Sequence, residues 1–96
     1  MSFGEYVRNL RESRNLYLRQ VAAKLDMDTA MMSKIEHGER RIKKEHLNKL
    51  AAILNTDSDS LKAQWYADQV VDLLNGETNI THIFKIVKKE IIKQPK

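Results

Sequence analysis

Hydrophobic residues recur at helical spacing along most of this chain. Phe3, Val7 and Leu10 follow one another at four and three positions, so they form one stripe on a helix expected over residues 3–13. The same kind of pattern predicts five further helices, at 18–25, from 29 up to the glycine at 38, at 47–54, from about 59 to 74 or 75, and from about 80 onward. The chain is therefore predicted to be all-helical.

A tight break separates the second and third of these helices. Asp26 can adopt the left-handed conformation more readily than most residues, and Met27 can turn inward beneath the break. Asp28 then offers a carboxylate to the free N–H groups of a new helix that begins at Thr29. Gly38 supplies the positive φ that ends this helix. The pattern predicts two short helices joined by a tight turn.

The third helix is expected to have two different faces. Met32 and Ile35 are three positions apart and face the core, which leaves small and basic side chains pointing outward. The outward residues are Thr29, Ala30, Ser33 and Lys34. A basic cluster, Arg40, Arg41, Lys43 and Lys44, comes directly after the helix. This clustering favours an acidic partner on that side of the molecule.

The C-terminal third carries more hydrophobic side chains than so small a protein can leave in water, so it must fold back on the domain or pair with another copy. We expect these helices to pair with another copy, and the alternative is an intramolecular hairpin that only extends the core of its own chain. The side chains expected at this dimerisation contact are Trp65, Val70, Leu73, Leu74, Ile83, Phe84, Val87 and Ile91. The last helix is also basic and amphipathic, which would permit contact with a membrane surface.

Composition narrows the class of protein. The 96 residues carry a net charge of +4 and no cysteine, which excludes disulfides and thiolate metal sites and fits a reducing compartment. His37, His46 and His82 share no metal-ligand spacing, and no phosphate loop or nucleophile–base pair is visible, so neither an enzyme nor a cofactor is expected. Without an export signal or a segment long enough to span a bilayer, the expected location is cytoplasmic.

Five separate elements keep the register of a known family. They are Leu10-Arg11, Val21-Ala22, Asp28, Ile35-Glu36 and Gly38. With them the chain resembles XRE/Cro-type, phage-repressor-like helix-turn-helix regulators over residues 3–61. The resemblance implies a five-helix lambda-repressor-like domain at residues 1–60. Beyond the resemblance, the helical pattern predicts a C-terminal extension at 61–96, an extended helical hairpin that we expect to serve dimerisation. The resemblance also implies a structural ion pair between Arg11 and Glu36.

Insertion of the third helix into a DNA major groove would bring its outward edge to the bases. The residues expected to read bases are Thr29, Ala30, Met31, Ser33 and Lys34. Lys34 can reach guanine O6 or N7, whereas Ala30 and Met31 can contact a thymine methyl group. The residues expected at phosphates are Tyr17, Leu18 and Arg19 at the start of the second helix, and His37, Arg40, Arg41 and Lys43 near the end of the third.

The resemblance implies a transcriptional regulator that binds a palindromic operator in double-stranded DNA as a homodimer. A repressor, a restriction-modification controller and an autoregulating antitoxin all remain open, and an antitoxin would also bind a toxin partner. The alternative is a protein-interaction module that uses the same fold without touching DNA. A membrane partner is not expected.

Overall fold

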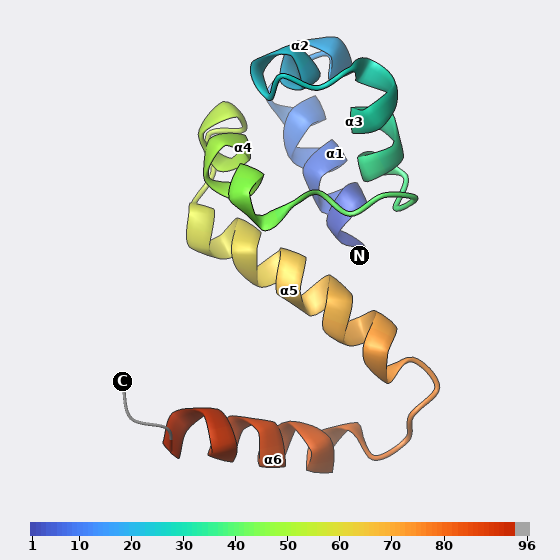
Figure 1. Ribbon diagram of the computed structural model, residues 1–96, viewed down its shortest axis with the longest axis vertical. Helices are drawn as coiled ribbons and strands as arrows, with labels where there is room; N and C mark the ends of the chain where they lie inside the picture. Colours follow the sequence, from blue (N-terminus) through green and yellow to red (C-terminus); the bar gives the residue numbers. More distant parts are fainter. Residues whose placement is uncertain (94–96) are drawn as a thin grey trace.

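The structure of the protein is a computed structural model that describes residues 1–93. Its elements are α1 (Phe3–Ser13), α2 (Leu18–Lys24), α3 (Thr29–Glu36), a short 3-10 helix η1 (Lys44–His46), α4 (Leu47–Ile53), α5 (Ser58–Leu74) and α6 (Ile80–Lys93). Within this part of the chain there is no strand. The all-helical, lambda-repressor-like prediction is confirmed, with α1–α4 and the start of α5 forming a domain and α6 lying apart from it (Figure 1).

Short polar side chains begin three of the helices. Asp28 accepts the N–H of Met31 at the start of α3 with a distance of 2.7 Å, and Asp57 caps α5 in the same way. Ser2 and Glu5 form a capping box at the start of α1. Hydrogen bonds from Ser2, first from its backbone N–H, lower the pKa of Glu5. The contribution of that carboxylate to stability is therefore present above its ordinary pKa and is lost as the pH falls through the lowered value.

Left-handed residues turn the chain between the helices. Asp26 has φ 54° between α2 and α3, as expected, and Gly38 has φ 78° after α3. Asn15 and Asn55 have the same conformation after α1 and α4, with φ values of 57° and 52°. Asparagine tolerates this region because its short polar side chain can hydrogen-bond locally. The tight turns of the domain therefore depend on asparagine and aspartate as much as on glycine.

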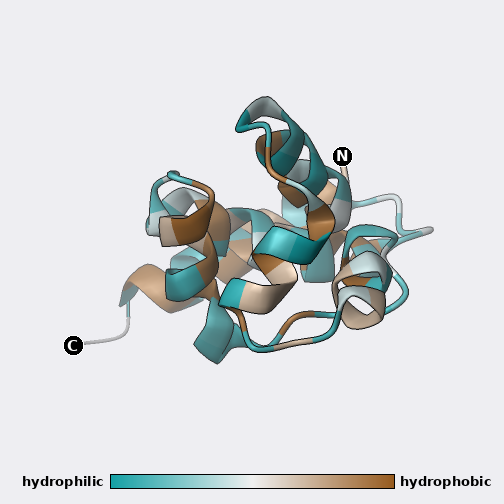
Figure 2. Ribbon diagram, turned by 90° about the horizontal axis from the view of Figure 1, so that it is seen from above, coloured by the Kyte–Doolittle hydropathy of each residue, from teal (hydrophilic) through white to brown (hydrophobic). Residues whose placement is uncertain are grey.

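The core of the domain lies among α1–α4 and the first turns of α5. Its buried hydrophobic residues are Phe3, Val7, Val21, Ala22, Leu25, Met32, Ile35, Ile42, Leu47, Leu50, Ala51, Leu54 and Leu61. Arg14 joins two helix ends at the edge of this core, because its Nε donates to the carbonyl of Leu54 at 2.9 Å. Figure 2 shows hydrophobic positions inside the domain and again in the helix that leads to the C-terminus.

The hydrophobic contacts of α5 with the core come from its first half. Leu61 is fully buried, and Trp65 packs against the core while its indole N–H donates to the carbonyl of Ile42 at 2.9 Å. The second half of α5 leads away from the domain to a turn at Gly76, whose φ is 89°. This second half therefore connects α6 to the domain and sets its distance from the core.

The helix α6 has no buried residue. It starts beside the end of α5, where Val70, Val71 and Leu74 line a hollow with Ile80 and Phe84. From there α5 and α6 diverge, so the expected hairpin is an open wedge and not a pair of helices packed along their length (Figure 1). The expected extension at 61–96 includes residues 94–96, which lie outside the described residues.

Candidate DNA-binding site

The α3 helix shows one edge to solvent and packs its back into the core. Met32 and Ile35 are buried, as expected, because both point towards the hydrophobic residues of α1 and α2. Thr29, Ala30 and Lys34 are exposed on the opposite side. The helix can therefore offer these side chains to a partner without unfolding any part of the domain.

Two of the expected base-reading residues are less accessible to solvent. Met31 is half-buried and packs against the core, so only part of its side chain is accessible. Ser33 is also half-buried, and its carbonyl accepts a hydrogen bond from Nδ1 of His37 at 2.7 Å. Since a carbonyl only accepts, Nδ1 of His37 carries the proton, and Nε2 is left for other contacts. His37 thus closes the end of α3 while remaining exposed.

A bidentate ion pair holds the end of α3 against α1. Arg11 Nε donates to Glu36 Oε2 at 2.8 Å, and Nη2 donates to Oε1 at 3.1 Å. The third donor of Arg11, Nη1, reaches the carbonyl of Leu16 at 2.9 Å. The side chain of Arg11 is 13% exposed and that of Glu36 is 4% exposed. The hydrogen bond to Glu36 raises the pKa of Arg11. The geometry is that of the ion pair implied by the resemblance, and it joins the end of α3 to α1.

A close approach between α1 and α3 was not predicted from the sequence. A Cβ atom on Gly4 would lie 2.4 Å from the backbone oxygen of Glu36 and 2.6 Å from that of Ile35. The close contact between α1 and α3 therefore requires a glycine at position 4, which does not form a turn. A glycine inside a predicted helix next to hydrophobic residues is the signal that could have indicated such a contact.

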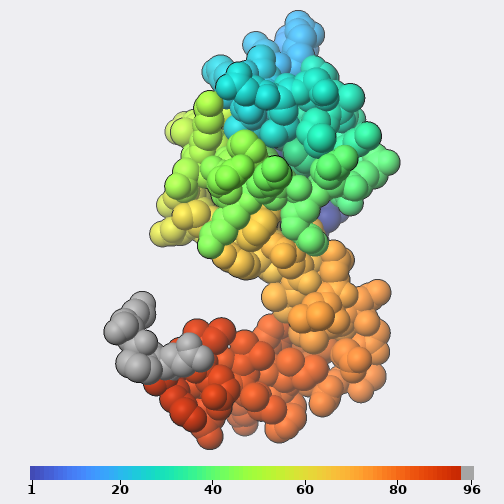
Figure 3. Space-filling view, viewed as in Figure 1, coloured from blue at the N-terminus to red at the C-terminus, as the bar shows by residue number. Residues whose placement is uncertain are grey.

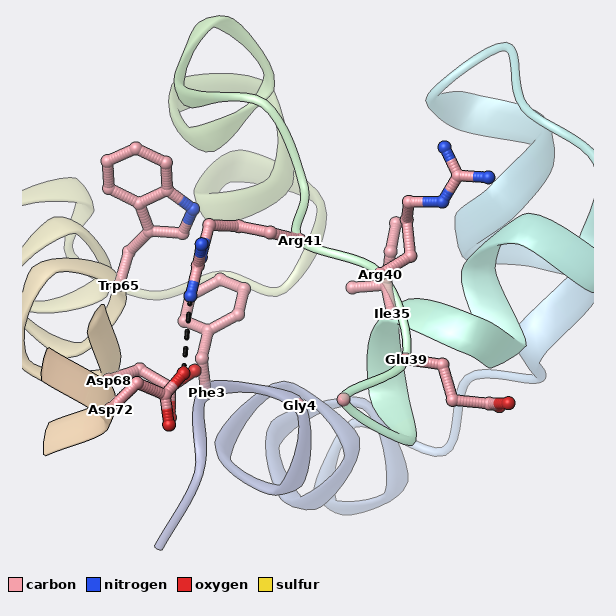
Figure 4. A pocket seen from close by; sticks show the side chains of 10 residues that line it. Phe3, Gly4, Ile35, Glu39, Arg40, Arg41, Trp65, Asp68 and Asp72 are labelled. Carbon is pink, nitrogen blue, oxygen red and sulfur yellow. Dashed lines mark hydrogen bonds and ion pairs between the residues drawn. The ribbon is translucent and has the colours of Figure 1, made fainter. Parts of the chain in front are cut away.

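The two neighbouring arginines after α3 point in different directions. Figure 4 shows Arg41 extending towards Asp68 and Asp72 of α5, while Arg40 points to the other side of the loop. Arg41 forms an exposed ion pair with Asp72 at 3.4 Å. These side chains line a pocket of about 220 Å³ with Trp65. Both arginines also line a second pocket, together with Met27, Met31 and Lys43.

The start of α2 presents the remaining expected phosphate contacts. Tyr17 is exposed, and the guanidinium of Arg19 lies 4.6 Å from the centre of its ring. The N–H of Tyr17 donates to the side chain of Gln20 at 2.7 Å, so it is already occupied. Leu18 is half-buried and packs against the core, and it can contribute only its backbone to a ligand.

The residues expected at the dimerisation contact fall into two groups. Trp65 packs within its own domain, and Val70 and Leu74 lie at the hollow between α5 and α6. The others are exposed or half-exposed along α6 and the end of α5: Leu73, Ile83, Phe84, Val87 and Ile91. Across residues 1–93 there is no helix both long and hydrophobic enough to cross a membrane, and no cluster of three metal-ligating side chains.

Two short helices, a tight turn and an exposed second helix define a helix-turn-helix unit. The sequence model of a helix-turn-helix domain matches residues 2–65, which is most of the chain. The chain therefore belongs to the helix-turn-helix domain family, and the predicted XRE-like character is confirmed.

The chain is also similar to a curated protein from Bacillus subtilis (strain 168) described as the uncharacterized HTH-type transcriptional regulator RghRB. The two are 30% identical over 89 residues, which cover 86% of this chain. The matched region spans 64% of the relative's length.

Proposed function

We propose that this protein binds double-stranded DNA in a sequence-specific manner and regulates transcription. The observation that carries the proposal is the exposed edge of α3, with Thr29, Ala30 and Lys34 outward and Met32 and Ile35 anchored behind it. An α-helix of this kind fits the width of the major groove. Family membership and the description of the Bacillus subtilis relative support the same function.

The proposed base contacts are graded by exposure. Lys34 is the first candidate, since it is exposed and can donate to guanine, and Thr29 and Ala30 are equally accessible. Met31 and Ser33 are half-buried, so we expect them to contribute less. Loss of a base contact should weaken binding and relax the preference at one base pair.

The proposed phosphate contacts surround this edge. Arg40, Lys43 and His37 are exposed after α3, and Tyr17 and Arg19 are exposed at the start of α2. Contacts of this kind fix the position of the protein on DNA but carry no sequence information. Arg41 and Leu18 are weaker candidates, because Arg41 is paired with Asp72 and Leu18 packs on the core.

A homodimer on a palindromic operator is the form of binding we propose. One α3 helix contacts few base pairs, and two copies separated by about one helical turn, roughly 34 Å, gain affinity together. Binding to an operator would repress transcription or regulate the protein's own gene. A repressor, a restriction-modification controller and an antitoxin that also binds a toxin partner all act in this way. If selection from a random library of duplexes enriches a palindrome, that sequence would indicate both the dimer and the spacing of its half-sites.

The proposal is tested by selecting bound duplexes from a random library and then titrating variants on the selected and on a scrambled duplex. Lys34→Ala should weaken binding to the selected duplex by about 1 to 3 kcal/mol and relax the preference at one position. The matched control is Lys89→Ala, which removes the same charge from α6, at the far end of the molecule from α3 (Figure 1).

Two results would contradict the proposal. If no sequence is enriched from the library and the scrambled duplex binds as well as any other, sequence-specific recognition is wrong. If Lys34→Ala weakens both duplexes equally, Lys34 is not a base-reading residue. Partner binding without DNA binding would favour the protein-interaction module.

A further inference from the structure

The loop after α3 places Arg41 between two different surroundings. In Figure 3 this segment, in green, lies at the surface with α3 above it and α5 below it. Arg41 lines one pocket with Asp68 and Asp72 of α5. It also lines the second pocket, with Met31 of α3 and with Lys43. Arg41 therefore stands at the boundary between an acidic surface of α5 and the surface that we propose to face DNA.

Two carboxylates of α5 attract the side chain of Arg41. Asp68 and Asp72 are four positions apart, so both lie on the same side of the helix. Figure 4 shows Arg41 extending towards both of them, and its Nη2 donates to Oδ2 of Asp72 at 3.4 Å. Attraction between opposite charges favours this orientation, in which Arg41 points away from Arg40.

The ion pair is open to exchange with another anion. The side chain of Arg41 is 47% exposed and that of Asp72 is 72% exposed, so solvent screens their attraction. A phosphate oxygen accepts the same guanidinium N–H groups as a carboxylate. Rotation of the long Arg41 side chain would bring these groups to the second pocket, while the buried Ile42 keeps the backbone in place. Asp72 and a DNA phosphate would therefore compete for Arg41.

We infer that Asp68 and Asp72 hold Arg41 away from DNA and thereby limit the sequence-independent part of the affinity. This inference rests on the proposed function, because it concerns the same DNA-binding surface. A contact between Arg41 and a phosphate carries no sequence information, so it would strengthen binding to every duplex alike. The two aspartates act through Arg41 and are positioning residues that do not touch the DNA.

The test is a titration of the selected and the scrambled duplex at several salt concentrations. Asp72→Asn removes the charge but keeps the shape of the side chain. It should strengthen binding to both duplexes about 2- to 5-fold. It should also steepen the slope of log K against log salt concentration by up to about 1, because the released Arg41 neutralises one further phosphate.

Asp59→Asn is the matched control for this variant. It removes the same charge from the first turn of α5, about 20 Å along the helix from Asp72. This separation exceeds the screening length of roughly 10 Å at 0.1 M salt. The control should leave the affinity and the salt slope nearly unchanged.

A double variant shows whether Asp72 acts through Arg41. In an Arg41→Ala background, Asp72→Asn should give no gain in affinity, because no guanidinium is left to be released. A carboxylate that repels DNA directly would give the same gain with or without Arg41. The difference between the two gains measures the coupling of the two residues.

The ion pair can also be tested without DNA. In ¹⁵N-labelled protein, the guanidinium N–H signals of Arg41 are assigned by their loss in Arg41→Ala. They should shift in Asp72→Asn and stay in place in Asp59→Asn. Unchanged signals in Asp72→Asn would mean that the pair does not form in solution, and the inference would be wrong.

The inference and the proposed function fail in different ways. An equal gain in the Arg41→Ala background, or a gain on the selected duplex alone, would overturn the inference, since Asp72 would then repel DNA directly or Arg41 would contact a base. A wild-type protein that binds DNA but gains nothing from Asp72→Asn overturns the inference alone. A wild-type protein that binds no duplex overturns both.

Discussion

Glu36 is a charged residue in an otherwise hydrophobic core, and its environment explains why. Arg11 satisfies both of its carboxylate oxygens and also bonds the carbonyl of Leu16, so no charge is left without a partner. These hydrogen bonds offset the cost of burying the two charges, and they join the end of α3 to α1. The ion pair therefore connects α1 to the helix that we propose to read DNA.

Arg11→Ala should lower the free energy of unfolding by about 3 kcal/mol, because it leaves the carboxylate of Glu36 buried without its partner. The control is Arg8→Ala, whose ion pair with Glu12 is exposed and should be worth less than about 1 kcal/mol. Urea denaturation followed by circular dichroism measures both. Equal losses in the two variants would mean that the buried pair is no more important than the surface pair.

At the scale of elements, the contact between α1 and α3 depends on how closely their backbones approach. The missing Cβ of Gly4 allows the first turn of α1 to lie directly against the end of α3. The atoms it would meet are backbone oxygens of Ile35 and Glu36, which cannot move without moving the helix. The orientation of α3 is therefore set at its end by two residues of α1, Gly4 and Arg11.

Gly4→Ala should destabilise the domain by about 2 kcal/mol or more, since the added methyl group forces α1 and α3 apart. Asn9→Ala, at an exposed position of the same helix, should change stability by no more than about 0.5 kcal/mol. Thermal unfolding of both variants provides the comparison. A Gly4→Ala protein as stable as the control would mean that α1 can shift without loss.

At the scale of the whole molecule, positive charge is divided between two regions. One surrounds α3, with Arg40 and Lys43 exposed there, and the other lies along α6. Arg41 is next to Arg40 in the sequence, but its side chain extends towards Asp68 and Asp72 of α5 and forms an ion pair with Asp72 (Figure 4). Net charge alone therefore overstates the number of cations near the proposed DNA surface.

Arg40→Ala should reduce the slope of log K against log salt concentration by about 1, and should weaken binding to all duplexes alike. Arg41→Ala should change the slope less, because Arg41 is paired with Asp72 and points away from Arg40. Titrations at several salt concentrations measure both. A larger change for Arg41→Ala would place the DNA on the side of α5.

The amino-acid sequence by itself determined the local elements of this protein. The spacing of hydrophobic residues predicted every α-helix of the described chain, and Asp28 and Gly38 indicated where α3 begins and ends, because caps and positive-φ residues act within a few positions. The residues of the proposed DNA-binding edge come from the same local pattern. The short helix η1 and the left-handed Asn15 were not predicted.

Only the tertiary structure decided what depends on residues far apart in the sequence. It revealed the contact of Gly4 with α3, the position of Trp65 under its own domain and the pairing of Arg41 with Asp72. It also opened the expected hairpin of α5 and α6 into a wedge. Helical periodicity shows which side of a helix is hydrophobic, but the neighbour that covers this side is set by packing between distant segments.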